Sequence, residues 1–517
     1  MNTAIHPLDA VIIVVYLVTL ALVGIWFSRR QRTLDDFFFA RHSMSWLPVG
    51  LSLMAALNSG IDYLMQPSAT IRYGVVLLIG TASWLLLYPW VTRVVLPFYR
   101  QLNAYTAYEF LEARFDVRVR MFAAAIFIVW RLGWMATAIY VPCLAISAAT
   151  NGAIPLTPTI VVLGALVTGY TMLGGIQAVI WNDVIQFCIM FGGLAATVWI
   201  SLTHVPGGLA EIWTAAQSAG KTSLAAPIDF AAGATVLGRV AAFFRQPINA
   251  AAVLVGITVG RIAGYTTDQV MVQRFQTTKS LRDSRRAFIV NAAGDALWMF
   301  GLSFVGLALL AYFLHHPLPQ EYASDRILPY FMSLAFPRGA VGLVLAAILA
   351  ASLSSIDSAV NSCTSVVVVD FYNRLVRDKP SAALVSEADA RGQVFISRVS
   401  TLVFGIAGTI LAANVARIGS LLEIANKLIN AFTGPLLGIY LLAMFSRRAT
   451  SGPVLAAGVI GTFTSYYVAY RTTIGFMWPS TFGLAATLAV GYALSIVLQT
   501  SASVEARRLT WREVMSS

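Results

Sequence analysis

The sequence predicts an all-α polytopic membrane protein. Of its 517 residues, 58% are hydrophobic and only 11% are charged, whereas a soluble chain carries roughly a quarter charged residues. Apolar runs of roughly 18 or more residues, each long enough to cross a bilayer as a helix, occur about thirteen times. No stretch between them is long enough for a separate soluble domain. We therefore expect a single transmembrane domain over residues 1–517.

The predicted spans follow one another along the whole chain. They cover residues 8–28, 45–72, 75–97, 121–149, 156–175, 177–202, 240–265, 287–314, 338–369, 394–414, 420–446, 452–472 and 479–499. The first run is followed by Arg29 and Arg30 and lacks a small-residue cleavage site, so we interpret it as a retained anchor helix and not as a signal peptide. The polar connections 206–238 and 315–338 are expected to carry short surface helices.

The charge distribution predicts the orientation. Lys and Arg concentrate in alternate loops, for example 29–41, 274–286 and 374–398, and the positive-inside rule places such loops in the cytoplasm. An odd number of spans then puts the N-terminus outside and the tail 500–517 inside. This arrangement explains the net charge of +12 without nucleic acid. We expect a multi-pass protein of the plasma or bacterial inner membrane, with the lipid bilayer around it and no obligate protein partner.

Polar residues interrupt the second span, SLMAALNSGIDYLMQPSATIRYG, with Asn58, Gly60, Asp62, Gln66 and Pro67 at hydrocarbon depth. Pro67 removes a backbone donor and Gly60 weakens the helix. We therefore expect a broken helix whose free carbonyls line a cavity or bind an ion; a packed proline kink is the alternative. An unpaired Asp62 would cost at least ~2.5 kcal/mol there, which predicts a cationic or hydrogen-bonding partner.

The ninth span, LAAILAASLSSIDSAVNSCTSVVVVD, carries a polar face. Ser354, Asp357, Ser358 and Asn361 recur at three- and four-residue steps, so they share one side of the helix. Small and hydroxylated residues on such a face are most often packing contacts. A carboxylate among hydroxyls and carbonyls instead forms the hard-oxygen set that alkali and alkaline-earth cations prefer. Asp357 makes us favour the cation site.

Other charges interrupt the remaining spans. Asp183 lies in the sixth span and is a second intramembrane carboxylate. Asp268 and Arg274, at the cytoplasmic end of the seventh span, are expected at the membrane interface, where a helix-end salt bridge and a transport role remain alternatives. Arg131 and Lys427 are the remaining deep charges that we identify, and a buried base more often neutralises a carboxylate than it binds a ligand.

Several segments, in the same order over nearly the whole chain, resemble the sodium:solute symporter family. They are TLDDFFFARHSMSW, YTAYEFLEARF, GGIQAVIWNDVIQF, TDQVMVQRF, ASLSSIDSAVNS and TGPLLGIYLLAMF. Within the family, QPSATIRYG and SGIDYLMQPS are most similar to the branch of the iodide, monocarboxylate and multivitamin transporters. The resemblance implies a LeuT-type core of two inverted five-helix repeats, 45–202 and 240–446. One extra helix (8–28) would precede this core and two (452–499) would follow it.

The resemblance also implies binding residues. The main sodium site would use the carbonyls of Ala55, Asn58 and Ala351 and the hydroxyls of Ser354 and Ser355. A second sodium site, present in only some members, would use Asp183, Ser354, Asp357 and Ser358. Asp357 replaces the Ser or Thr usual at its position, and we expect it to face Asp183 across the ion. Asn58, Asp62, Thr81, Tyr265 and Lys427 match substrate-facing positions of relatives, and we add Gln66 and Arg131 as candidate substrate contacts.

These features predict a secondary active symporter and not an enzyme. An inward sodium gradient would drive solute uptake by alternating access, since one ion moving down 100 mV contributes ~2.3 kcal/mol. Lys427 and Arg131 would give the cavity a cationic end, which favours a small organic anion such as a monocarboxylate; the pattern of sugar-transporting relatives is absent. A zwitterion or amino-acid symporter, a proton-coupled carrier that titrates Asp357, and a non-transporting membrane sensor remain alternatives.

Overall fold

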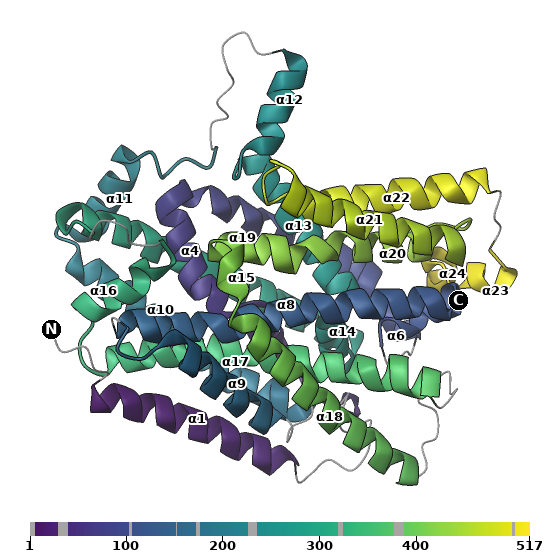
Figure 1. The fold of residues 1–517 in the computed structure, drawn as a ribbon, viewed down its shortest axis with the longest axis horizontal. Coiled ribbons are helices and arrows are strands. Elements are labelled where there is room, and N and C mark those ends of the chain that lie inside the picture. The colour runs from purple at the N-terminus through teal and green to yellow at the C-terminus, as the bar shows by residue number, and fades with distance from the viewer. Residues whose placement is uncertain are drawn as a thin grey trace.

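The computed structural model describes residues 6–28, 40–102, 106–150, 152–171, 176–225, 235–318, 324–376, 387–498 and 502–516. Within these ranges the chain is helical, and its only β-pairing is an isolated bridge between Met44 and Thr278. The long helices run mainly along the long axis of the molecule, from the end where α1 begins to the end where α23 and α24 lie (Figure 1).

The first half of the chain holds the helices up to α10. They are α1 (Pro7–Ser28), α3 (Trp46–Leu57), α4 (Gly60–Tyr73), a segment of 3-10, α and π turns that contains α5 (Ser83–Pro89) and α6 (Leu96–Leu102), α7 (Glu109–Arg114), α8 (Val117–Ala149), α9 (Leu156–Thr171) and α10 (Ile176–His204).

The second half holds the remaining helices. They are α11 (Gly208–Ser218), α12 (Val236–Arg245), α13 (Ala250–Thr267), α14 (Gln269–Gln276), α15 (Leu281–His315), α16 (Ile327–Ala335), α17 (Ala340–Val366, continued by π turns to Val376), α18 (Glu387–Ala412), α19 (Leu421–Ile424), α20 (Thr433–Phe445), α21 (Ser451–Arg471), α22 (Pro479–Val497), α23 (Val504–Arg508) and α24 (Trp511–Ser516).

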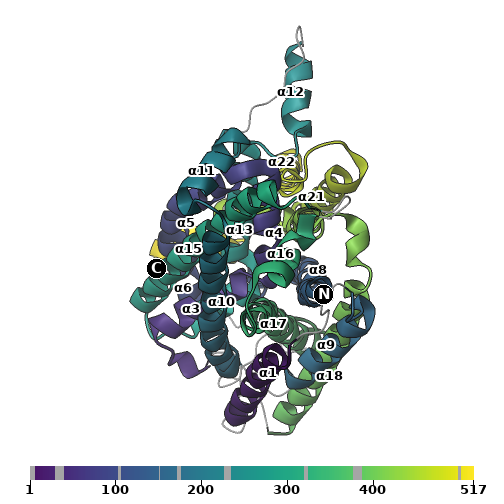
Figure 2. The same cartoon turned by 90° about the vertical axis from the view of Figure 1, so that its left-hand side faces the viewer.

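Most predicted spans overlap these helices closely, but α15 begins at Leu281 and α18 at Glu387, six and seven residues before the predicted starts at 287 and 394. By length and composition, eight helical segments of the described chain can cross a membrane, and shorter apolar helices occur at α1, α3, α9 and α20. The expected span 240–265 differs, because α12 ends at Arg245 and α13 begins at Ala250. Pro247 cannot donate to a continuing helix, and the side chain of Asn249 accepts a bond of 2.8 Å from the N–H of Ala252, which caps the new helix. As a result α12 projects from the bundle (Figure 2).

The second span is broken between α3 and α4. Asn58 and Ser59 have extended backbone conformations. The Ser59 hydroxyl accepts from the N–H of Ile61 at 3.1 Å, and the Asp62 carboxylate accepts from the N–H of Ser59 at 2.8 Å, so a capping box starts α4. Pro67, which we expected to contribute to the interruption, lies inside the continuous helix α4. The break therefore arises from the capping residues and not from the proline.

A matching break separates α13 from α14. Asp268 is extended, with φ −85° and ψ 117°, and its Oδ1 accepts from the N–H of Val270 at 2.9 Å. The two broken segments belong to the two predicted repeats. Such a pair is the usual sign of a transporter binding site.

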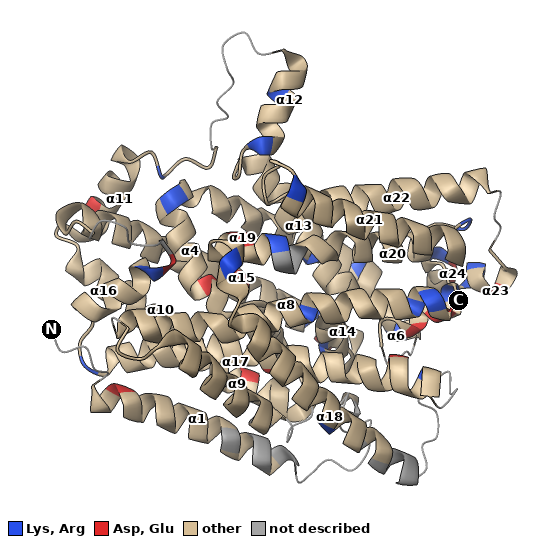
Figure 3. Ribbon diagram, viewed as in Figure 1, with Lys and Arg blue, Asp and Glu red and all other residues tan. Residues whose placement is uncertain are grey.

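Helix α17 forms the centre of the bundle. It packs against α3, α4, α8 and α10, and all its residues from Val344 to Val366 are buried. Its polar face therefore meets other helices and not lipid. Many Lys and Arg residues lie at the end of the bundle that carries α6, α23, α24 and the start of α8 (Figure 3).

Candidate functional site

The residues of the predicted main sodium site meet where α3 ends against α17. The Ser354 hydroxyl donates to the carbonyls of Ala55 and Ala351, both at 2.9 Å, and the Ser355 hydroxyl donates to the Ala351 carbonyl at 3.3 Å. Asn58, the C-cap of α3, follows three residues after Ala55, and all five residues are buried. Carbonyls at a helix C-terminus, together with hydroxyls, present negative partial charge. This donor set fits a sodium ion.

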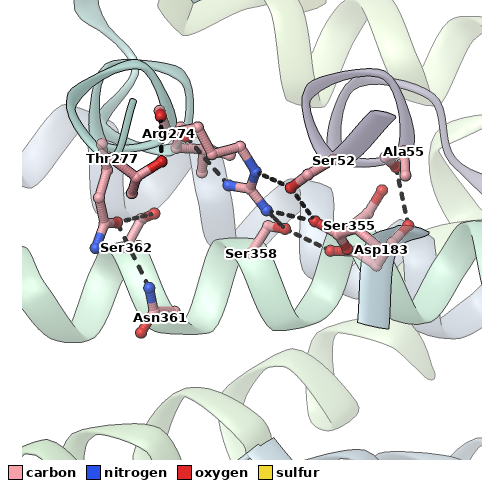
Figure 4. Close-up of polar contacts among 12 residues, drawn as sticks. Ser52, Ala55, Asp183, Arg274, Thr277, Ser355, Ser358, Asn361 and Ser362 are labelled. Carbon is pink, nitrogen blue, oxygen red and sulfur yellow. Dashed lines mark hydrogen bonds and ion pairs between the residues drawn. The ribbon is translucent and has the colours of Figure 1, made fainter. Parts of the chain in front are cut away.

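Asp183 lies on α10 beside this contact and is 1% exposed. Its Oδ2 accepts from the Ser52 hydroxyl at 2.5 Å and from Nη2 of Arg274 at 2.9 Å, as Figure 4 shows. The same Nη2 donates to the Ser358 hydroxyl at 2.5 Å. Within the described residues, the buried Oδ1 of Asp183 has no hydrogen-bond partner. A buried carboxylate oxygen without a partner is costly, and a bound cation would satisfy it.

Asp357 is held by a different helix. Its Oδ1 accepts from the Thr171 hydroxyl of α9 at 2.6 Å, while Asp183 lies on α10. The structure therefore brings Asp183 and Ser358 together through Arg274 and directs the Ser354 hydroxyl to the main site. That Asp357 faces Asp183 stays a prediction.

Asp268 and Arg274, expected at the cytoplasmic end of a span, are both enclosed by other helices. Asp268 is 1% exposed and Arg274 is fully buried. Arg274 also donates from Nε to the Ser52 hydroxyl at 2.8 Å. Its guanidinium thus joins α14 to α3, α10 and α17. A burial this complete could not be read from a sequence position near the predicted end of a span.

A cavity of about 210 Å³ lies between the two helix breaks. Asn58 and Ser59 line it from one break and Asp268 from the other. Six of the seven predicted substrate residues line it: Asn58, Asp62, Gln66, Thr81, Arg131 and Tyr265. The polar side chains that interrupt the apolar spans therefore converge on one compartment.

Lys427 is the exception, and the expectation that it faces this cavity is wrong. Its ammonium lies 3.6 Å from the Glu423 carboxylate, so it does not pair with Asp62 either. Lys427 lies in a π-helical turn in which the preceding residues, Ala425 and Asn426, line the cavity. The altered helical period directs the lysine elsewhere.

Arg131 supplies the cationic wall of the cavity from α8. It forms an ion pair with Asp268, and its guanidinium carbon lies 4.8 Å from the ring centre of Trp130 and 5.4 Å from that of Trp134. Within the described residues, the Nε of Arg131 and the indole nitrogens of both tryptophans are buried donors without a hydrogen-bond acceptor. All three residues line the cavity, and a buried donor without an acceptor is costly. Sequence reasoning missed the tryptophans, which look like ordinary apolar residues of a span.

A second ion pair in the cavity wall was also missed. Arg261 of α13 donates to Asp295 of α15 at 2.5 Å and to the Ser83 hydroxyl at 2.8 Å, and it lies over the ring of Trp84. Both charged residues line the cavity. The sequence could have indicated this pair, because Arg261 and Asp295 are each a single charge in an otherwise apolar run.

The whole chain is similar to known sodium-coupled transporters. The chain is 30% identical to a sodium/sialic acid symporter of Aliivibrio fischeri over 94% of its own length and 92% of the relative. It is 28% identical to the human sodium-coupled monocarboxylate transporter 1, over 89% and 73% of the two chains. The solved outward-open structure of a Na⁺-coupled sialic acid symporter superposes with a TM-score of 0.83, at 27% identity, over 96% of this chain and 99% of that one.

These likenesses confirm the predicted LeuT-type all-α fold and the resemblance seen in the sequence motifs. A model of the sodium:solute symporter family matches residues 37–461. The relatives named above are sodium-coupled transporters and not enzymes. The chain therefore belongs to the sodium:solute symporter family and is a multi-pass membrane protein that transports a small solute together with Na⁺.

Proposed function

We propose that this chain imports a carboxylated solute, with the solute carboxylate bound by Arg131, Trp130 and Trp134. The observation that carries this proposal is the set of three buried N–H donors without acceptors on the α8 wall. A carboxylate supplies several acceptor lone pairs, and a charge-assisted bond to a guanidinium is about twice as strong as a neutral one. Relatives named for sialic acid and for monocarboxylates support it, because both kinds of solute carry a carboxylate.

Coupling follows from the position of the sodium ligands. Ala55 is a predicted sodium ligand, and Asn58, three residues later on the same helix end, lines the cavity. A sodium ion held between Ala55 of α3 and Ser354 of α17 fixes this end of α3 against the centre of the bundle. The cavity wall then takes the conformation that binds the solute. Ion and solute therefore stabilise the same conformation, and the binding of each favours the binding of the other.

A second sodium ion is part of the proposal. The unpaired Oδ1 of Asp183 supports it, with Ser354, Ser358 and Asp357 on the neighbouring face of α17. Arg274 holds only the Oδ2 of Asp183 and leaves Oδ1 for the ion. Asp357 would neutralise the added charge.

The proposal is tested by solute-stimulated uptake of radioactive sodium into proteoliposomes. Carboxylated compounds should stimulate uptake, and uncharged compounds should not. Trp134→Phe removes one indole donor and keeps the ring, so the concentration for half-maximal stimulation should rise about tenfold, as expected for one lost bond to a charged group. Stimulation by uncharged solutes alone, with the same affinity in Trp134→Phe, would overturn the assignment.

A further inference from the structure

The charges that line the cavity do not balance. Among the described residues of its wall, the acidic ones are Asp62, Asp268 and Asp295, and the basic ones are Arg131 and Arg261. Arg131 pairs with Asp268, and Arg261 pairs with Asp295. Each guanidinium therefore has its own carboxylate in the wall. Asp62 is the carboxylate in excess.

Asp62 is held only from one side. Its Oδ2 accepts from the N–H of Ser59, and within the described residues Oδ1 makes no hydrogen bond and neither oxygen is in an ion pair. The N-terminus of α4 offers about half a positive charge, which compensates the carboxylate in part. A neutral Asn could accept the same bond from the Ser59 N–H, so this bond alone does not require a charged residue in the cavity.

The Arg261 guanidinium is unavailable to Asp62 as a full partner. It donates to Asp295, to the Ser83 hydroxyl and to the Gly80 carbonyl at 3.2 Å, with its face covered by Trp84. Asp295 in turn accepts from the indole of Trp84 at 2.7 Å. These contacts fix the pair in the wall formed by α5, α13 and α15. Arg261 is thus a positioning residue and not a second receptor for a carboxylate.

Electrostatic balance then constrains the solute. A net charge enclosed in a cavity of low dielectric constant is costly. One sodium ion at the Ala55–Ser354 site adds one positive charge beside Asn58 and neutralises the excess carboxylate. The filled cavity stays neutral only when the solute itself has no net charge.

We propose, resting on the function proposed above, that the solute is a zwitterion whose carboxylate binds at Arg131 and whose protonated amine binds Asp62. This reverses the preference for an organic anion, which depended on Lys427 facing the cavity. A simple anion would leave the filled cavity with a net negative charge, because the sodium ion balances only Asp62. An amine placed at Asp62 Oδ1 instead supplies the donor that this oxygen lacks.

The test compares matched pairs of compounds by solute-stimulated radioactive sodium uptake into proteoliposomes. Glycine, γ-aminobutyrate and 6-aminohexanoate are set against acetate, butyrate and hexanoate, with sialic acid as a further anion. One zwitterion should stimulate uptake at a concentration at least tenfold below that of its partner without the amine. Stimulation by anions alone overturns the proposal that the solute is a zwitterion, but it leaves the proposal of a bound carboxylate intact. Stimulation by no carboxylated compound counts against both.

Variants of Asp62 assign the effect to this residue. Asp62→Asn keeps an acceptor for the Ser59 N–H and removes the charge, so the preference for the zwitterion should fall at least tenfold, whereas Asp62→Glu should retain it. Glu423→Gln is the matched control, because Glu423 is also a first-turn helix residue but pairs with Lys427 outside the cavity wall. An unchanged preference in Asp62→Asn overturns the proposal. The comparison of compound pairs on the wild-type protein tests it even where a variant fails to fold.

Discussion

Ser354 connects two helices at the main sodium site, since its hydroxyl donates both to Ala55 of α3 and to Ala351 of its own helix. Ser354→Ala and Ser355→Ala should each raise the sodium concentration for half-maximal uptake about tenfold, which corresponds to about 1.4 kcal/mol. Solute uptake titrated with sodium measures the shift. Ser362→Ala, two turns further on α17 and bonded to Gln273, is the control. A wild-type sodium dependence in both site variants would place the ion elsewhere.

Single residues were predictable where chemistry stood out against an apolar background. Asp62 and Arg131 could be found because charge at hydrocarbon depth needs a reason. Trp130 and Trp134 could not, because an indole serves equally as core and as donor. Lys427 was misplaced because its position was inferred from relatives, whereas here it lies in the π turn Ala425–Ile429 and pairs with Glu423.

The break between α3 and α4 depends on close packing of α4 against α17. A Cβ on Gly60 would lie 2.2 Å from the Ser352 hydroxyl and 2.8 Å from the Ile348 carbonyl. Gly60→Ala should therefore lower stability by about 1–3 kcal/mol through overpacking, and uptake should fall with it. Gly192→Ala is the control, since nothing lies within 4 Å of its Cβ position. Equal melting temperatures of the two purified variants would contradict this account.

At the scale of elements, length and polarity predicted most helices and the interruption of the second span, but not the residues that cause it or the break between α13 and α14. Hydropathy gave the limits of α8, α10 and α22 within a few residues. The Ser59–Asp62 capping box is a short local pattern that a hydropathy average over a whole span does not detect. Pro67 suggested a break inside what is the continuous helix α4. Asp268 both ends α13 and caps α14, a double role that only the break itself reveals.

The arrangement of the whole molecule came from the motifs and not from periodicity. Helical periods say which face is apolar, but they do not say which of many similar helices are neighbours. The order of the family motifs supplied that information, and the likeness to the solved sialic acid symporter agrees with it. The inverted-repeat limits 45–202 and 240–446 and the orientation in the membrane stay predictions.

The orientation can be tested because the loops differ in charge. Residues 279–286 are rich in Lys and Arg, whereas the connection that contains Ser223 has few charges. The positive-inside rule therefore puts Arg282 in the cytoplasm and Ser223 outside. Both side chains are exposed. In a variant with Cys143, Cys188 and Cys363 replaced by alanine, a membrane-impermeant maleimide should label Ser223→Cys in intact cells. Arg282→Cys should be labelled only after the membrane is permeabilised. The reverse pattern would show the opposite orientation in the membrane.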